Sequence, residues 1–307
     1  MNDTTLIKQE LDYQNTGELD NVTPEAASII AEGQTRVFLS GFEDPSLVRF
    51  SKLRPTGRPV AFNDALTIQV PEDGGAITAL GVLDDKLIIF KEERCYYVQG
   101  DGPNNFGLGA YTPPALVSSD AGCSNQRSVV LVPDGLMFQT DKGIYLLDRG
   151  LRLSYIGGEV EAYNSQTITA ATLLSDSNQV RFLTSSGSTL LYDYLFRQWS
   201  TFTNHEGVDA AMSRGTYHYA TSAGLVRQES STNFRDVTTG YQLVIETSWI
   251  KLNTLQSYRR VRKLLVLGEY RSVHNLKITT AYDYEEAVTD SREFDPADTM
   301  NLGTWVA

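Results

Sequence analysis

The chain has 307 residues and a formal net charge of −12, from 26 basic and 38 acidic residues. A hydrophobic content of 41% and a charged content of 21% are typical of a folded soluble chain and argue against long disordered segments. No apolar run approaches the roughly 20 residues that a helix needs to cross a bilayer. The first residues also lack the basic and apolar regions of a signal peptide. We therefore expect no membrane insertion.

Residues 1–26 are the first predicted segment, an extended stretch that contains "TTLIKQELDY". From residue 27 the chain repeats one pattern five times: an apolar strand with small residues, a polar turn, a second apolar strand, a second turn and a third strand. The clearest copy is "VPDGLMFQTDKGIYLLDRG" at 132–150, where Asp134-Gly135 and Asp141-Lys142-Gly143 mark two tight turns. The five copies begin at Ser28, Ala76, Arg127, Ile168 and Asp209.

The spacings between successive copies are 48, 51, 41 and 41 residues, which is about the size of a four-stranded propeller blade. "LTIQV" at 66–70 and "QWSTF" at 198–202 are candidate fourth strands. We predict an all-β fold in which residues 27–240 form a β-propeller of four-stranded antiparallel blades. Residues 1–26 are then a candidate strand for closing the ring. A β-sandwich or an up-and-down barrel is the alternative arrangement of such repeats.

After residue 241 the predicted strands become longer, in "YQLVIETSWIKL", "YRRVRKLLVLGEY" and "HNLKITTAYDYE". Several alternate with a period of two, which is typical of strands with one buried face. Arg260, Arg262 and Lys277 are predicted on one face, and Val261, Leu264 and Val266 on the other. Residues 241–307 are therefore interpreted as a partial β-sandwich-like domain that follows the propeller.

Charge is distributed unevenly over this last domain. Residues 251–277 hold seven Lys or Arg and one Glu, whereas 278–307 hold one Arg and seven Asp or Glu. The basic segment can meet acidic residues of a neighbouring subunit, as the 278–307 segment would supply. A possible subunit interface is therefore assigned to Arg259, Arg260, Arg262, Lys263, Arg271 and Lys277.

The residues that usually carry metals or cofactors are scattered along the chain. His205, His218 and His274 are isolated, and Cys95 and Cys123 are 28 positions apart with no CxxC pair. "GDGPNNFGLG" at 100–109 is rich in glycine, but "AYTPPAL" follows it. Two prolines oppose the helix that a phosphate cradle requires. We predict a loop there, reduced cysteines, and neither a metal nor a cofactor.

Two further stretches are candidate catalytic or binding motifs. "SSDAGCSN" at 118–125 resembles the Asp-box of sialidase-type propellers in Ser118, Asp120 and Gly122, but Asn125 replaces the final aromatic residue. We interpret it as a turn in which Asp120 bonds nearby backbone amides. Glu159 and Glu161 have strand spacing that places both on one face, as a glycosidase pair would need. Nothing else marks them, and the chain is predicted not to be an enzyme.

Three stretches of the repeat region carry a resemblance to a known family: "ITALGVLDDKLIIFKEERCYYVQGDGPN", "SSDAGCSNQRSVVLVPDGLMFQTDKGIYLLDRGLRLSYIGGEVEAYN" and "VRFLTSSGSTLLYDYLFRQWSTFTNH". The run from Gly75 to Phe202 resembles the β-propeller portion of the nozzle, or tail tubular, proteins of short-tailed bacteriophages. The similarity extends more loosely back to "RVFLSGFEDPSLVRFSK" and forward through "WIKLNTLQSYRRVRKLLVLGEY", and it offers no active-site residues. Members of that family are typically longer, with further β domains after the propeller.

The resemblance implies a structural component of a virion tail, assembled in the host cytoplasm, whose copies form a ring through which DNA leaves the particle. Its implied partners are other tail proteins and further copies of itself. The acidic balance fits a conduit that does not hold DNA, because proteins grip phosphates with Lys and Arg. The alternative function is a glycan-binding or sialidase-like propeller module, with Tyr111, Tyr155 and Tyr163 as candidate aromatic platforms.

Overall fold

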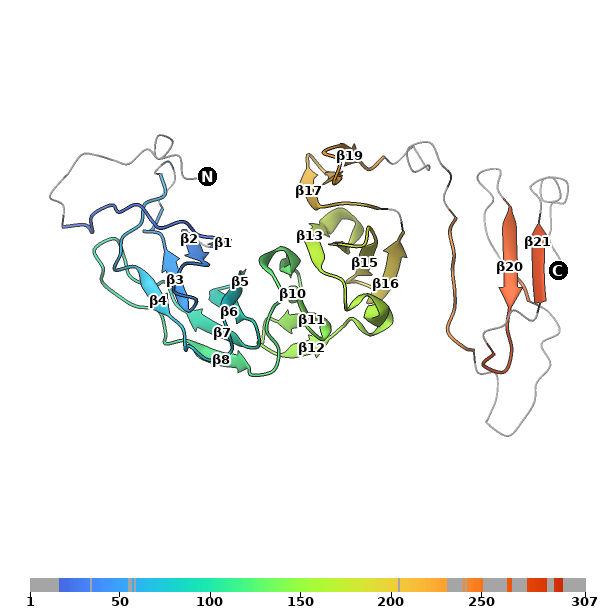
Figure 1. The fold of residues 1–307 in the computed structure, drawn as a ribbon, viewed down its shortest axis with the longest axis horizontal. Coiled ribbons are helices and arrows are strands. Elements are labelled where there is room, and N and C mark those ends of the chain that lie inside the picture. The colour runs from blue at the N-terminus through green and yellow to red at the C-terminus, as the bar shows by residue number, and fades with distance from the viewer. Residues whose placement is uncertain are drawn as a thin grey trace. The chain divides into compact units, whose positions relative to one another are not determined.

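The computed structural model describes residues 17–33, 35–54, 57, 59–203, 205–230, 240, 242–250, 264–266, 275–285 and 290–294. The chain divides into two compact units, residues 1–232 and 233–307. Within the first unit, Figure 1 shows successive β-sheets that follow one another along an arc, from β1–β4 to β17–β19.

Each sheet of the first unit is antiparallel and runs through its strands in chain order. The first sheet holds β1 (Ile29–Gly33), β2 (Arg36–Ser40), β3 (Leu47–Phe50) and β4 (Thr67–Gln69). The second holds β5 (Ile77–Leu83), β6 (Lys86–Lys91), β7 (Cys95–Gln99) and β8 (Ala115–Ser118). The third holds β9 (Val130–Val132), β10 (Gly135–Thr140), β11 (Gly143–Asp148) and β12 (Leu153–Tyr155).

The fourth sheet holds β13 (Ile168–Leu174), β14 (Gln179–Thr184), β15 (Thr189–Asp193) and β16 (Gln198–Phe202). The fifth has three strands among the described residues, β17 (Asp209–Ser213), β18 (Thr216–Ala220) and β19 (Val226–Gln228). Short 3-10 helices lie between strands at η1 (Gln126–Ser128), η2 (Gly158–Tyr163) and η3 (Ser175–Ser177).

The predicted all-β fold of four-stranded antiparallel sheets is confirmed. One sheet stands at each predicted repeat, and the fourth strands expected at 66–70 and 198–202 are β4 and β16. The first strands of neighbouring sheets contact one another, β1 with β5, β5 with β9, β9 with β13 and β13 with β17. This arrangement is propeller-like. Closure into a ring and the number of blades stay predictions.

The turn residues explain why the hairpins form where they do. Thr140 pairs with Gly143, so Asp141 and Lys142 alone connect β10 to β11. Asp84 begins the turn between β5 and β6, and Asn178 ends the connection between β13 and β14. Their φ angles of 55° and 56° are left-handed, a conformation that Asp and Asn tolerate better than other side chains. Gly135 has φ of 155°, and a Cβ there would lie 1.9 Å from the carbonyl oxygen of Leu147.

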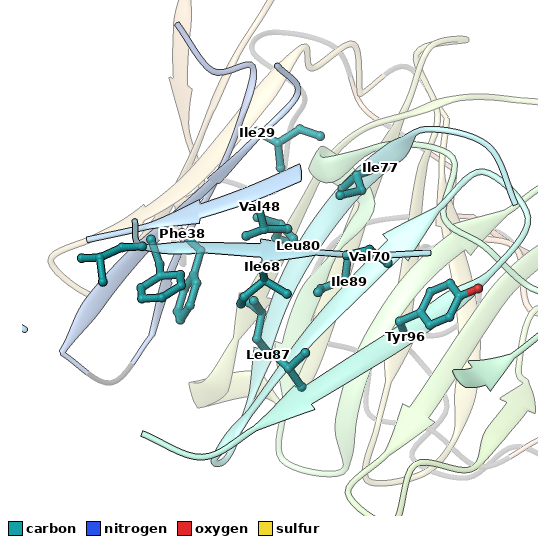
Figure 2. Close-up of a cluster of buried hydrophobic side chains, with 13 residues drawn as sticks. Ile29, Phe38, Val48, Ile68, Val70, Ile77, Leu80, Leu87, Ile89 and Tyr96 are labelled. Atoms are coloured by element: carbon teal, nitrogen blue, oxygen red, sulfur yellow. The ribbon is translucent and has the colours of Figure 1, made fainter. Parts of the chain in front are cut away.

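The core consists of apolar layers between successive sheets. Figure 2 shows the layer between the first and second sheets, where Phe38, Val48 and Ile68 face Leu80 and Ile89. Similar layers separate the second sheet from the third and the third from the fourth. Strands flanked by sheets on both faces are buried along their whole length, as in β10. This explains why "LIIF" and "GLMF" are unbroken apolar runs rather than alternating ones.

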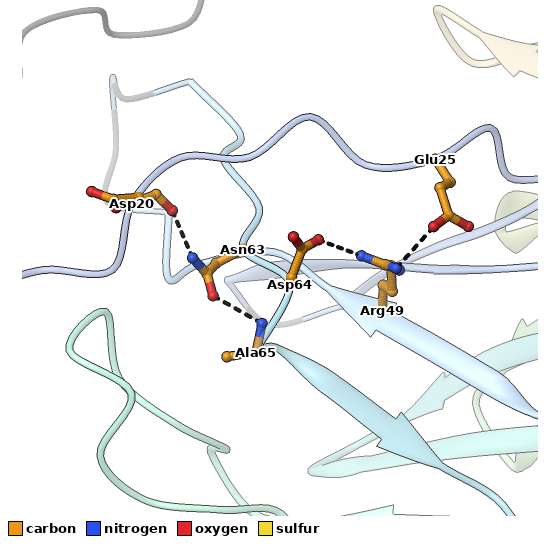
Figure 3. Close-up of polar contacts among 6 residues, drawn as sticks. All are labelled: Asp20, Glu25, Arg49, Asn63, Asp64 and Ala65. Carbon is orange, nitrogen blue, oxygen red and sulfur yellow. Dashed lines mark hydrogen bonds and ion pairs between the residues drawn. The ribbon is translucent and has the colours of Figure 1, made fainter.

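The segment from residue 17 to 27 is tied to the first sheet. Val22 forms an isolated antiparallel bridge with Phe62. Figure 3 shows Arg49 paired with Glu25 at 3.1 Å and with Asp64 at 2.7 Å, while the Asn63 amide donates to the Asp20 carbonyl. The stretch "TTLIKQELDY" that was predicted to close the ring lies outside the described residues.

The second unit contains a two-stranded antiparallel sheet, β20 (Leu276–Thr280) and β21 (Asp290–Phe294). β20 lies in the third of the long strands predicted there, and that strand is confirmed. The prediction of a strand in "YQLVIETSWIKL" is wrong for residues 242–250, and residues 264–266 also lie outside any strand. Alternating apolar residues require a paired neighbour to become a strand, and both segments lack one among the described residues. The rest of the predicted sandwich lies outside that set.

Candidate interaction surfaces

Of the six basic residues predicted as a subunit interface, the structure describes one, Lys277. This residue is exposed on β20 and stands directly opposite Glu293 of β21 in the strand register. A basic residue of the 251–277 segment therefore faces an acidic residue of the 278–307 segment within the same chain. The remaining residues lie outside the described part of the chain: Arg259, Arg260, Arg262, Lys263 and Arg271. The interface role of the set stays a prediction.

The second unit also exposes apolar side chains in consecutive positions. Leu243, Val244 and Ile245 are 76%, 71% and 80% exposed, and residues 264–266 are each about half exposed. Contiguous exposed apolar surface is uncommon on soluble monomers and usually marks an interaction site.

A third exposed apolar feature is the turn that joins β15 to β16 in the first unit. Leu195 and Phe196 occupy its tip and are 63% and 70% exposed. The Asp193 carboxylate accepts hydrogen bonds from the backbone N–H groups of both residues at 2.9 Å. A tight turn normally carries polar residues or glycine at such positions, so the composition of this tip is unusual.

The tyrosines considered as glycan platforms differ in exposure. Tyr111 packs into the core between the first and second sheets, edge-on to Phe50 at 5.1 Å between ring centroids. Tyr163 packs against the core between the third and fourth sheets. Tyr155 is 42% exposed, and its ring lies 5.2 Å from that of Tyr145. Of the three, Tyr155 therefore offers the one exposed ring.

The Asp-box-like stretch lies in the connection between β8 and β9, but the predicted role of its aspartate is wrong. The Asp120 carboxylate forms an ion pair with Nζ of Lys142 at 2.6 Å, rather than bonding backbone amides. This contact raises the pKa of Lys142 above its ordinary value. Asp120 and Lys142 are 22 positions apart, so a local turn motif in the sequence cannot predict that they form an ion pair.

Glu159 and Glu161 do not lie on a strand. Both belong to η2, a short 3-10 helix that begins at Gly158 directly after Gly157, so the prediction of a shared strand face is wrong. The Glu159 carboxylate accepts a hydrogen bond of 3.4 Å from the backbone N–H of Trp199. Alternation of acidic and apolar residues over a few positions does not separate a strand from a single tight helical turn.

Sequence reasoning missed a polar cluster between the fourth and fifth sheets. Arg181 on β14 is 5% exposed, and its two terminal nitrogens bond the Glu229 carboxylate at 2.8 and 3.0 Å. The guanidinium lies over the ring of Tyr217, 4.5 Å from its centroid. The Tyr217 hydroxyl and the Arg181 Nε are buried without a hydrogen-bond partner among the described residues. Burial raises the pKa of Tyr217.

The isolated histidines and cysteines take part in local packing. Nδ1 of His205 lies 2.7 Å from the Thr189 hydroxyl, and Nδ1 of His218 lies 3.0 Å from the Thr216 carbonyl. Cys95 and Cys123 are buried free thiols, and burial raises the pKa of Cys123 to about 11. Both cysteines are therefore protonated near neutral pH.

Within the described ranges, no three His, Cys, Asp or Glu side chains are grouped to hold a metal ion. His274 lies outside those ranges. The glycine-rich stretch 100–109 is a loop between β7 and β8, as predicted, in which Asn104 Oδ1 accepts from the N–H groups of Phe106 and Leu108. A search of the described residues for a helix long and apolar enough to span a membrane finds none.

Comparison with known proteins leaves the family open. No protein family model and no curated protein match the chain. Among solved structures, PorZ of Porphyromonas gingivalis aligns with a TM-score of 0.44 and 10% identity, over 70% of this chain and 28% of PorZ. BamB of Moraxella catarrhalis aligns with a TM-score of 0.43 and 10% identity, over 72% of this chain and 60% of BamB. Hsv2 of Kluyveromyces marxianus aligns with a TM-score of 0.44 and 11% identity, over 74% of this chain and 65% of Hsv2.

Proposed function

We propose that the chain is a structural component of a short-tailed phage tail, in which copies assemble into a ring around the path of the exiting DNA. The observation that carries the proposal is the exposed apolar surface of the second unit, at 242–250 and 264–266. Leaving such side chains in water costs about 25 cal/mol per Å², so a neighbouring subunit that covers them would be bound favourably. In a protein that assembles with its own copies, this surface would be buried against a neighbouring subunit.

Three sequence features support the same role. The resemblance to tail nozzle proteins rests on stretches whose strands are β5–β7, β9–β12 and β14–β16. Residues 1–250 hold 18 basic and 30 acidic residues, which favours passage of a polyanion over its capture. The charge asymmetry between 251–277 and 278–307 supplies complementary surfaces for contacts between copies.

The proposal predicts that the purified full chain self-associates into closed assemblies. Sedimentation velocity across a concentration series, followed by electron microscopy of the largest species, measures both size and shape. Rings of uniform diameter are the expected result. A chain that stays monomeric at every concentration would overturn the proposal. The neighbouring genes provide an independent test, because portal or adaptor genes beside this one are expected.

A glycan-binding module is the second candidate, and the exposed ring of Tyr155 favours it. The Tyr155 hydroxyl accepts a hydrogen bond of 3.3 Å from Nδ2 of Asn164, so an aromatic face and an amide lie side by side. Sugars bind such combinations through stacking and directed hydrogen bonds. Binding on a glycan array that disappears in Tyr155→Ala would support this candidate. Equal binding by both proteins would exclude the Tyr155 surface.

A further inference from the structure

The fifth sheet ends in an open strand edge. Each of the first four sheets has four strands, whereas the fifth has three among the described residues and ends at β19. Three-residue strands are common at the sheet edges of this chain, as in β4, β9 and β12. A strand of three residues that paired with β19 would therefore give the fifth sheet the same number of strands as the others.

The backbone of β19 is oriented to accept such a strand. The Thr221 N–H donates to the carbonyl of Leu225, so these opposite residues form a hydrogen-bonded pair next to the β18–β19 register. Hydrogen-bonded and non-hydrogen-bonded pairs alternate along an antiparallel ladder. The N–H and C=O groups of Val226 and Gln228 therefore point away from β18. An unpaired row of such groups is a template for a further strand.

The layer between the fourth and fifth sheets has an uncovered aromatic ring on its outermost strand. Phe202 lies on β16, and the Arg181 guanidinium is 5.7 Å from the centroid of its ring. Arg181 also bonds Glu229, which directly follows β19, so this ring faces the fifth sheet. Phe202 is nevertheless 41% exposed. A fourth strand of the fifth sheet would lie opposite β16, where an apolar side chain would cover the ring.

The same chain contains a segment suited to this edge. Leu243, Val244 and Ile245 are strongly exposed and lie outside any strand. Val and Ile favour strands, because their branched side chains fit a pleated surface. Trp249, later in the segment, already contacts Tyr284, with 5.1 Å between ring centroids. Residues 243–245 are therefore the part of the segment that offers both backbone and apolar side chains to a partner.

We infer that residues 243–245 of one copy pair with the edge of β19 in a second copy, as the fourth strand of its fifth sheet. The structure of one chain leaves both elements unpaired, and they belong to different units. The inference rests on the proposed function, because it names a contact by which copies assemble. It joins two different surfaces, and such a heterologous contact produces a ring, or an open filament where the rotation does not close.

The first test uses proline to block the edge. Gln228→Pro removes an N–H that β18 does not use, so the sheet should remain folded while the added strand loses a hydrogen bond. We expect self-association in sedimentation velocity to weaken by about tenfold or more.

The matched control is Gln69→Pro on β4, which is also an exposed glutamine on an outer strand. The Val70 N–H donates to the Ser46 carbonyl, so by the same alternation the Gln69 N–H points outward. This variant should associate like the unaltered chain. Equal association of the two proline variants would overturn the inference.

The second test locates the contact with single cysteines. Val226→Cys places a thiol on the edge of β19, and Val244→Cys places one on the apolar segment. The native Cys95 and Cys123 are buried and should not react. Both substitutions change exposed side chains, so folding should be unaffected. When the two proteins are mixed and treated with a short bismaleimide, we expect a crosslinked dimer that neither protein forms alone.

A chain with both substitutions, Val226→Cys/Val244→Cys, separates pairing between copies from pairing within one chain. Crosslinked multimers are expected at concentrations where the unaltered chain associates. Crosslinks confined to single chains would show that each segment pairs with its own β19, and would overturn the inference. An associating chain that forms no crosslink would also overturn it and leave ring assembly standing. An unaltered chain that never associates would overturn both.

Discussion

The contact between the second and third sheets and the contact between the fourth and fifth sheets are built differently. Phe90 and Phe138 meet at 4.5 Å between centroids inside a fully buried apolar layer that joins the second and third sheets. The fourth and fifth sheets share a smaller apolar cluster, and Arg181 bonded to Glu229 lies beside it. The first contact is stabilised by burial of apolar surface. The second depends on an ion pair whose acidic member is 49% exposed, so it should open more readily.

The largest effect is expected for Phe138→Ala. Phe138 has no exposed surface, and truncation of a buried aromatic ring typically costs about 3–5 kcal/mol through lost burial and the cavity that remains. Urea unfolding of the first unit, followed by fluorescence, should show this loss of unfolding free energy. Phe196→Ala, at 70% exposure, is the control and should stay within about 0.5 kcal/mol of the unaltered chain. Equal effects for the two variants would contradict the burial assigned to Phe138.

The ion pair between the fourth and fifth sheets predicts an asymmetry between its two members. Glu229→Ala should cost about 2 kcal/mol or more, because it leaves the buried Arg181 guanidinium without its counter-charge. Arg181→Met should cost less, because it keeps the apolar stem and leaves a half-exposed carboxylate that water can solvate. Hydrogen exchange in β17–β19 is the measurement. Faster exchange in Arg181→Met than in Glu229→Ala would contradict the prediction.

A smaller effect concerns pH and the buried Lys91 at the junction of the first and second sheets. Its ammonium donates to Ser46 Oγ at 3.1 Å and to the Pro71 carbonyl at 2.6 Å. Burial lowers the pKa of Lys91 below 10.5. Between the folded and unfolded pKa values the unfolded chain binds the extra proton, so this residue makes stability rise with pH in that window.

Lys91→Met removes this contribution. The stability of the unaltered chain relative to the Lys91→Met variant should therefore increase as pH approaches 10.5, measured by urea midpoints at several pH values. A relative stability that falls over this interval would show that the charged form is the one favoured by the fold.

The smallest expected signal is binding to duplex DNA. At about 150 mM salt, a chain with 26 basic and 38 acidic residues should not shift duplex DNA in a gel at micromolar concentration, because such binding takes several Lys or Arg contacts to phosphates. The basic segment 251–277 is the place where such contacts would gather. Micromolar binding that weakens steeply with salt, and disappears when Arg259, Arg260 and Arg262 become Glu, would replace the conduit role with one that holds DNA.

The sequence predicted the features that local chemistry determines. Asp134-Gly135 and Asp141-Lys142-Gly143 mark tight turns because glycine adopts backbone angles that other residues avoid, and the hairpin of the third sheet was located from them. Contacts between distant positions were not predictable. Asp120 with Lys142 and Arg181 with Glu229 join different connections or sheets, and no spacing rule relates them. Alternation of side-chain type along the sequence also wrongly predicted strands at Glu159 and at 242–250, because this pattern does not show whether a neighbouring strand is present to pair with.

Assembly of copies into a ring is tested most directly by electron microscopy of the purified full chain at the highest concentration that sedimentation shows to be associated. Closed particles of uniform diameter with a central opening are predicted. Monomers at every concentration, or open filaments without closure, would contradict the role of this chain as a ring-forming component of a DNA conduit.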